Sequence, residues 1–320
     1  MPKVTKLTFI VIVFLMATLF PSSAMAEKKV VIVLFSEDTR YMDAASGIKD
    51  KLKEGGFGEP QIKIIEEHAG ANIARAAELV KKIAATKMDL IFSIGTPITM
   101  ALAREIKHVP IVFSIVYDPV ESGIAKGWES SGNNTTGTST KIPMSKLLDT
   151  LTKFKPVKRV AVLYTPGERQ SMLAAEDLQE IQSQYHMSIT PVPFTKIDDF
   201  GLLLPEVLRT SDALYITGSN LVTSQLATIV DMATKAKVVT ITHLEDLVEK
   251  GVLLGVCTDS YQLGRLAGEM GVKILKGAKP AAIPIDTLKE YSVIINMKTA
   301  RAGQYQVSPK FKKTVTREIP

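Results

Sequence analysis

The side chains that could bind a ligand have one feature in common. Each lies at the end of a short run of apolar residues or follows such a run. In the first half of the chain they are Phe35, Ser36, Gly95, Thr96, Pro97, Tyr117 and Asp118. In the second half they are Tyr164, Glu168, Gln170, Ser171, Ser219, Asn220, His243 and Asp259. If the runs are strands of open α/β sheets, these side chains lie at the carboxyl ends, where such sheets bind their ligands.

The segment from Gly95 to Pro97 shows what chemistry such an end could do. Gly95 allows a positive φ or a close backbone approach, Thr96 can cap the following helix, and Pro97 fits the first turn of that helix. Two interpretations stay open for this loop. It is either a plain strand-to-helix turn or a site where free N–H groups and the positive helix end hold a carboxylate or phosphate.

Acidic and aromatic residues at the other ends suggest a zwitterionic ligand. Asp259 and Glu168 could hold an ammonium group, although an acid before a helix also stabilises the helix dipole by roughly 0.3–1 kcal/mol. Tyr41, Tyr117 and Tyr164 could form an aromatic pocket. Tyr215 lies in the middle of an apolar run, so we expect it in the core.

The sequence carries no catalytic signature. None of its four His residues has a partner at metal-ligand spacing, and it has no Gly-x-Ser-x-Gly elbow, phosphate loop or dinucleotide fingerprint. The pair Ser46 and Lys49 fits a four-residue lactamase pattern whose companion motifs are missing. His243 could act as a general base, but without a nucleophile we interpret it as a ligand-contacting or hydrogen-bonded side chain. We predict no catalytic residue, no metal, no cofactor and no enzyme activity.

Strand-like and helical patterns alternate along the chain. Runs rich in Val and Ile cover residues 30–35, 90–94, 111–116, 160–164, 213–217, 238–242 and 252–256. Helical spacing of apolar residues covers 71–85, 224–236 and 261–275. This alternation predicts an α/β protein with doubly wound parallel sheets covered by helices on both faces.

Two halves of the chain resemble each other. Asp89 to Thr96 and Asp212 to Ser219 share the order Asp, apolar strand, Gly, hydroxyl, and two further strand pairs recur at nearly the same separation. A constant period indicates duplication, although single βα units also resemble one another by chance. We therefore expect two α/β lobes with a ligand cleft between their strand ends.

The first 26 residues have the pattern of an export signal. Lys3 and Lys6 precede an apolar run over residues 7–20, and Ala24 and Ala26 suit cleavage after Ala26. The run is short for a bilayer-spanning helix, so an uncleaved anchor is the lesser alternative. The 320 residues carry a formal net charge of +6, and the scattered basic residues favour a solvated surface over nucleic acid binding. We expect a soluble protein in the periplasm or otherwise outside the cytoplasm.

Several stretches carry a family resemblance. They are Ser93 to Pro97, Val109 to Phe113, Asp118 to Val120, Thr136-Gly137, Val162 to Pro166, Tyr261 to Gly264, Lys273 to Gly277 and Ile294 to Asn296. Together they resemble the ABC transporter substrate-binding protein family that includes the tryptophan-binding TrpX-like proteins, over residues 29–309. The resemblance implies the type I periplasmic binding protein fold, with the lobes joined by a three-stranded hinge, and an amino acid ligand.

The resemblance also implies ligand contacts for particular residues. They would be Thr96, Pro97, Asp118, Glu168, Ser171, Asn220 and Asp259. This chain departs from the family at Thr165 and Gln170, where Asn is frequent, and at Ser219, where Asp is frequent. Loss of an acid at Ser219 is expected to change which head group is bound.

The sequence therefore predicts residues 29–140 plus 260–285 as lobe 1, residues 141–259 plus 286–309 as lobe 2, and a frayed tail over 310–320. The lobes would close on a zwitterion, with its carboxylate near Ser36, Thr96 and Pro97 and its ammonium at Asp259, helped by Glu168. The protein would be a monomer that delivers its small-molecule ligand to an ABC permease in the inner membrane. A ligand sensor for a signalling receptor and an exported hydrolase using His243 are the alternatives.

Overall fold

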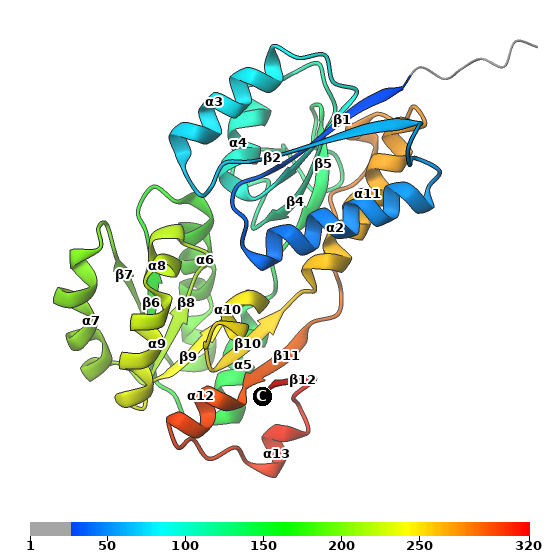
Figure 1. The fold of residues 1–320 in the computed structure, drawn as a ribbon. Helices are drawn as coiled ribbons and strands as arrows, with labels where there is room; N and C mark the ends of the chain where they lie inside the picture. Colours follow the sequence, from blue (N-terminus) through cyan, green and yellow to red (C-terminus); the bar gives the residue numbers. More distant parts are fainter. Residues whose placement is uncertain (1–26) are drawn as a thin grey trace, which may run out of the picture.

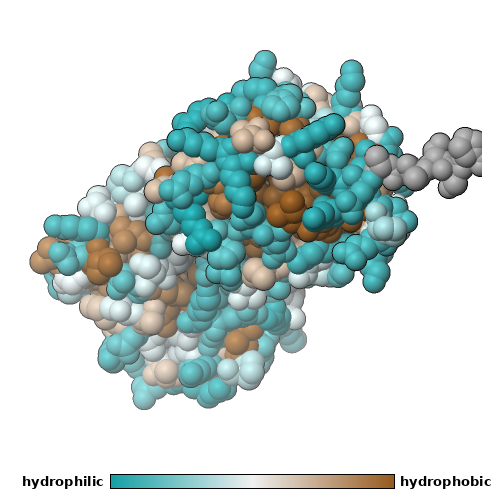
Figure 2. Space-filling model, turned by 45° about the horizontal axis from the view of Figure 1, so that its top comes forward, coloured by the Kyte–Doolittle hydropathy of each residue, from teal (hydrophilic) through white to brown (hydrophobic). Residues whose placement is uncertain are grey.

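The computed structural model describes residues 27–320, which form two lobes with the chain's early and late segments interleaved (Figure 1). The predicted signal peptide, residues 1–26, lies outside the described residues. No helix of the described part combines the length and the apolar character needed to cross a bilayer. The face in Figure 2 is mixed, with hydrophobic patches separated by hydrophilic residues.

The first lobe is a five-stranded parallel sheet in the order β2-β1-β3-β4-β5. Its strands are β1 (Lys28–Leu34), β2 (Ile62–His68), β3 (Leu90–Ile94), β4 (Ile111–Val116) and β5 (Thr135–Ser139). Its helices are α2 (Thr39–Glu54), α3 (Ile73–Ala84), α4 (Thr96–Glu105) and α11 (Ser260–Leu275). Helices α2 and α11 pack together on one side of the sheet, while α3 contacts α4. Strands β3 and β4 are buried throughout, because helices cover both faces.

The second lobe is a seven-stranded sheet in the order β12-β11-β10-β9-β8-β6-β7. Its strands are β6 (Arg159–Tyr164), β7 (Ser188–Pro193), β8 (Ala213–Ile216), β9 (Val239–Thr242), β10 (Leu254–Cys257), β11 (Ser292–Asn296) and β12 (Arg317–Ile319). Its helices are α5 (Met144–Phe154), α6 (Arg169–Glu180), α7 (Asp198–Thr210), α8 (Asn220–Ser224), α9 (Leu226–Lys235), α10 (Glu245–Glu249), α12 (Met297–Ala302) and α13 (Pro309–Lys312). Short 3₁₀ turns occupy Gln182–Tyr185 and Pro280–Ala282. Among the strand pairs of residues 27–320, only β10–β11 is antiparallel.

The chain passes between the two sheets three times, at residues 140–143, 258–259 and 286–291. The third crossing is tied to the first, because Ser139 N–H donates to the Asp286 carbonyl at 2.9 Å and Thr138 forms a parallel bridge with Asp286. A hinge of three segments allows the lobes to rotate while few backbone angles change.

The predicted α/β class with two sheets dominated by parallel strands is confirmed. The sequence patterns missed β2, β5, β7, β11 and β12, which are partly exposed, polar or very short. The prediction that residues 310–320 form a frayed tail was wrong. Residues 310–320 contain β12, which pairs with β11, and the side chain of Phe311 is buried in the core of the second lobe. The division into lobes at the stated boundaries remains a proposal.

Candidate functional site

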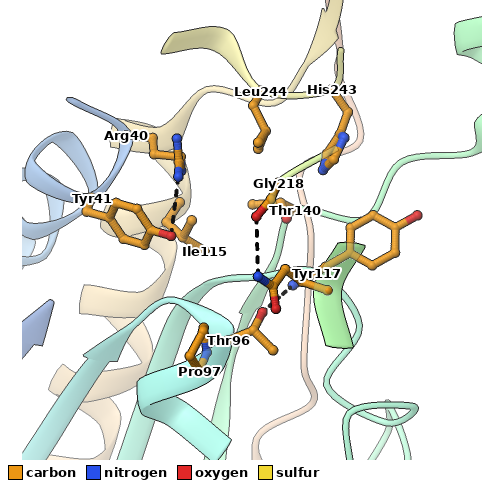
Figure 3. Close-up of a pocket in the computed structure, with 11 residues that line it drawn as sticks. Arg40, Tyr41, Thr96, Pro97, Ile115, Tyr117, Thr140, Gly218, His243 and Leu244 are labelled. Carbon is orange, nitrogen blue, oxygen red and sulfur yellow. Dashed lines mark hydrogen bonds between the residues drawn. The ribbon is translucent and has the colours of Figure 1, made fainter. Parts of the chain in front are cut away.

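A small chamber lies where the carboxyl ends of the two sheets face each other (Figure 3). The space that a water-sized sphere can reach inside it is only about 30 Å³, so the chamber is narrow in this arrangement of the lobes. We call it the inner chamber; its lining consists of Arg40, Tyr41, Thr96, Pro97, Ile115, Tyr117, Thr140, Gln170, Gly218, His243 and Leu244. The first seven come from the first lobe and its exit at residue 140, and the last four follow β6, β8 and β9 of the second lobe.

A wider groove opens beside the inner chamber, and the two share Pro97 and Gln170. We call it the outer groove. Its charged lining comprises Arg104, Lys107, Arg169 and a single acid, Glu168. The inner chamber has no acid in its lining. Within the described residues, Glu168 is therefore the one carboxylate that lines either space.

The structure brings some of the predicted site residues together and separates others. Thr96, Pro97, Tyr117, Gln170 and His243 line the inner chamber. Phe35, Glu168 and Asn220 line the outer groove. Ser36, Gly95, Asp118, Tyr164, Ser171, Ser219 and Asp259 line neither.

Three of the separated residues have structural roles that account for their chemistry. Asp118 accepts hydrogen bonds from the N–H groups of the next turn, and it forms an ion pair with Lys141 at 2.8 Å. Ser219 caps α8 through the Val222 N–H at 3.1 Å. Asp259 is exposed and caps α11. In this arrangement the Asp259 carboxylate serves the helix end and lies outside both spaces, and its contact with the ligand's ammonium group stays a prediction.

The amino end of α4 borders the inner chamber. Gly95 precedes it with a φ of 108°, and Thr96 and Pro97 form its first turn. The first N–H groups of a helix have no partner within that helix, and they carry its positive dipole end. Thr96 Oγ1 accepts a hydrogen bond from the Tyr117 N–H at 3.3 Å. This end of the chamber is suited to a carboxylate.

Glu168 and Gln170 form a second polar group at the border of the chamber and the groove. Glu168 accepts a hydrogen bond from the Asn220 N–H at 2.6 Å. Burial raises the pKa of the Glu168 carboxyl, although backbone donors such as this N–H oppose the rise. The Gln170 amide nitrogen donates to Glu168 Oε2 at 3.0 Å and to the Gly218 carbonyl at 3.3 Å. Its NH₂ group thus lies between a carboxylate and a carbonyl, the two acceptors that an ammonium group prefers.

Contacts join the lobes on both sides of the chamber. On one side, Arg40 of α2 forms a 2.6 Å ion pair with Asp246 of α10, and their side chains are only 4% and 2% exposed. Lys250 bridges to Asp38 at 2.9 Å and lies 3.5 Å from Asp246. We call these four residues the interlobe ion cluster. On the other side, Arg169 Nε donates to the Glu121 carbonyl at 3.1 Å.

His243 is buried between the chamber and the core of the second lobe. Its Nδ1 lies 2.7 Å from the hydroxyl of Tyr215, which is fully buried as expected. Burial, followed by the nearby Arg40 charge, lowers the pKa of His243 to about 3. A base with such a low pKa takes up protons poorly at neutral pH, which argues against the hydrolase alternative.

This buried imidazole should make the protein less stable in mild acid. Below pH 6.5, the ordinary pKa of His, the unfolded chain binds a proton at His243, whereas the folded chain does not bind it until the pH approaches 3. The free energy of unfolding therefore has its full value above pH 6.5 and falls as the pH drops toward 3. The loss is about 1.4 kcal/mol per pH unit, or about 2 kcal/mol by pH 5. Urea unfolding at pH 7.5 and 5.0 should show this extra loss in the wild type and not in His243→Gln. Equal losses in both proteins would contradict it.

Sequence reasoning did not select Arg40, Ile115, Thr140, Gly218 or Leu244 as site residues, although all line the chamber. Gly218 and Leu244 closely follow predicted strands and Ile115 lies near the end of one, so a wider window at the strand ends would have included these three. No local signal marks Arg40, because its partner Asp246 lies 206 residues away in the sequence. No group of His, Cys, Asp and Glu within residues 27–320 is arranged to hold a metal.

Known proteins resemble this chain over nearly its whole described length. Residues 29–316 match the family model of the ABC transporter substrate binding protein family. A "Tyrosine-binding protein" from Clostridioides difficile is 27% identical over 282 residues, covering 88% of this chain and 82% of that protein.

Solved structures share the two-lobed fold. An ABC domain in complex with L-Trp from Streptococcus pneumoniae is 24% identical, with a TM-score of 0.86 over 92% of this chain and 100% of that one. A ligand-free, open substrate binding protein with adhesive properties from Clostridium difficile is 28% identical, with a TM-score of 0.73 over 91% of this chain and 98% of that one.

Proposed function

This chain belongs to the ABC transporter substrate binding protein family, and from that premise we propose that it captures an amino acid with an aromatic side chain between its lobes. It would do so outside the cytoplasm and deliver the ligand to a membrane permease. The observation that carries the ligand class is the Gln170 amide, whose nitrogen lies between the Glu168 carboxylate and the Gly218 carbonyl, two acceptors that an ammonium group could use. The tyrosine-binding relative supports the same class.

The chamber offers a separate place for each part of such a ligand. Its carboxylate would meet the amino end of α4 and the Thr96 hydroxyl. Its ammonium would displace the Gln170 amide and lie between Glu168 and the Gly218 carbonyl. The side chain would pack among the apolar lining, which includes Tyr117, Ile115 and Leu244. Charge-assisted bonds at one end and apolar burial at the other are sufficient for micromolar binding, about 8 kcal/mol.

Closure of the lobes would complete the site. The chamber takes its lining from both lobes, and the contacts on its two sides hold them together. The overall arrangement is more similar to the L-Trp complex than to the ligand-free, open structure, although the open one is closer in sequence. This comparison supports a closed arrangement for the described chain, which would separate to admit ligand.

A thermal shift screen of the mature protein tests the ligand class. L-Tyrosine, L-tryptophan and the other amino acids would be compared with sugars, purines and short peptides. A ligand at a hundred times its Kd adds about 2.7 kcal/mol of stability, which raises the unfolding temperature by several degrees. Stabilisation by a sugar or purine, with no response to any amino acid, would refute the proposal.

Gln170→Ala should tighten the binding of L-tyrosine at least about fivefold, the lower end of what two hydrogen bonds contribute. The ligand then no longer has to break the two hydrogen bonds of the amide, each contributing about 0.5–1.5 kcal/mol. The des-amino analogue 3-(4-hydroxyphenyl)propanoate should gain nothing, since it has no ammonium group. Titration calorimetry with both compounds measures the difference.

The matched control is Gln179→Ala, because Gln179 lies on the same helix and bonds to the Ile189 carbonyl away from the chamber. It should leave both affinities unchanged. If Gln170→Ala weakens both compounds equally, the amide is an ordinary ligand contact and not the occupant of an ammonium site.

A further inference from the structure

We propose that His243 presents a fixed Nε2–H hydrogen-bond donor to the ligand, and that Tyr215 is the positioning residue that selects this tautomer. The ligand would then carry a hydrogen-bond acceptor at the far end of its side chain, as the phenol of tyrosine does. This last part rests on the proposed function, whereas the tautomer itself does not.

The assignment of the proton begins with the Tyr215 hydroxyl. It lies 2.7 Å from His243 Nδ1, both side chains are buried, and no other partner of that hydroxyl is recorded among residues 27–320. A buried hydroxyl that does not donate leaves an unsatisfied proton, which costs more than the bond itself is worth. Tyr215 therefore donates and Nδ1 accepts. A neutral imidazole whose Nδ1 accepts carries its proton on Nε2.

The remaining nitrogen, Nε2, is the one left for a ligand in the chamber that His243 lines. His243 lines the inner chamber, and within the described chain no acceptor is recorded for its Nε2. The Tyr117 ring packs edge-on against the imidazole at a centroid distance of 5.3 Å, which limits rotation of the ring. Because the imidazole is held neutral by burial, with its pKa lowered to about 3, it stays a donor over the physiological range.

The position of His243 decides which part of the ligand it meets. Figure 3 shows Arg40, Leu244 and His243 across the chamber from Thr96 and Pro97. The amino end of α4 and the Glu168 group would hold the ligand's carboxylate and ammonium, so the opposite end receives the side chain. Arg40 and His243 both offer donors there, so a side chain that ends in an acceptor gains hydrogen bonds that an apolar end or a group that only donates, such as an indole N–H, does not make with them. A phenol oxygen would accept.

Two measurements test the inference. Long-range ¹H–¹⁵N spectra of ¹⁵N-histidine-labelled protein should show the Nε2–H tautomer for His243 without ligand, and a loss of that preference in Tyr215→Phe. Calorimetry should show L-tyrosine binding at least tenfold tighter than L-phenylalanine, and Tyr215→Phe should shrink that ratio to threefold or less. Tyr305→Phe is the control, because the Tyr305 hydroxyl bonds to the Val238 carbonyl outside the chamber.

Each outcome decides a separate point. An Nδ1–H tautomer in the wild type would overturn the role of Tyr215, whatever the ligand. Equal binding of tyrosine and phenylalanine would overturn the inference that the ligand's side chain ends in a hydrogen-bond acceptor. If no amino acid binds but the Nε2–H tautomer is seen, the proposed function fails while the positioning role of Tyr215 stands. A change in Tyr305→Phe as large as in Tyr215→Phe would show a merely structural effect.

Discussion

Asp246→Ala is expected to weaken ligand binding about a hundredfold while both lobes stay folded. The substitution leaves the Arg40 guanidinium buried in the closed molecule without its 2.6 Å partner. Removing one member of a buried pair typically costs 3–5 kcal/mol, because the remaining charge is uncompensated. We expect the lower end of that range, since Asp38 still lies 3.4 Å from the Arg40 guanidinium. A loss of about 3 kcal/mol corresponds to a hundredfold.

The free energy cost of the substitution opposes closure of the lobes, because the two partners belong to different lobes. Arg40 lies on α2 and Asp246 on α10, so separation of the lobes returns both charges to water. In the open form the guanidinium is hydrated and the mutation costs little. The substitution therefore reduces the fraction of molecules that are closed and competent to bind, and the apparent Kd rises in proportion.

Calorimetry with L-tyrosine and small-angle scattering of the ligand-free protein measure the two effects. Asp246→Ala should raise the Kd and increase the radius of gyration. The control is Asp231→Ala, which breaks an exposed pair with Lys235 within α9 and should change neither value. If Asp246→Ala lowers the free energy of unfolding by about 3 kcal/mol with no change in scattering, the pair stabilises the fold and not the closure.

The sequence was informative wherever a local pattern determines the outcome. Runs of mostly apolar residues defined β3 and β4 to the residue, because strands covered on both faces are buried along their whole length. Once the strands were known, topology brought their carboxyl ends together. Thr96, Tyr117 and His243 could therefore be placed at one site although they lie far apart in the chain.

The sequence was ambiguous where one residue type serves two purposes. An acid before a helix can meet a ligand or cap the helix, and both Asp259 and Asp118 accept hydrogen bonds from their own backbone in this structure. The Arg40–Asp246 pair could not be predicted, because nothing local indicates which of many charges will be buried. The tail was misjudged for a related reason, since the charged residues around Phe311 hid the one side chain that anchors it.

The second large effect is expected for Gly264→Ala, which should destabilise the protein by about 3 kcal/mol. Helices α2 and α11 come from opposite ends of the chain and lie side by side in the first lobe (Figure 1). A Cβ at Gly264 would lie 2.1 Å from the Ala44 carbonyl oxygen, and one at Gly47 would lie 2.2 Å from the Tyr261 carbonyl oxygen. Both contacts are with backbone, which cannot rotate away, so the helices must separate. Overpacking of this kind costs about 1–3 kcal/mol, and this contact is at the severe end.

Urea unfolding measures the loss, and Gly201→Ala is the matched control. Gly201 lies inside α7 with nothing within 4 Å of its added Cβ, so alanine there should stabilise the protein by roughly 0.5–1 kcal/mol. The Gly264 effect should also reach the binding site, because α2 carries Arg40 and Tyr41 one turn before Ala44. A displaced α2 would misplace both the interlobe ion cluster and the chamber wall, so ligand affinity should fall together with stability. Unchanged stability in Gly264→Ala would show that the helices can separate without cost, and that α11 does not fix the position of Arg40.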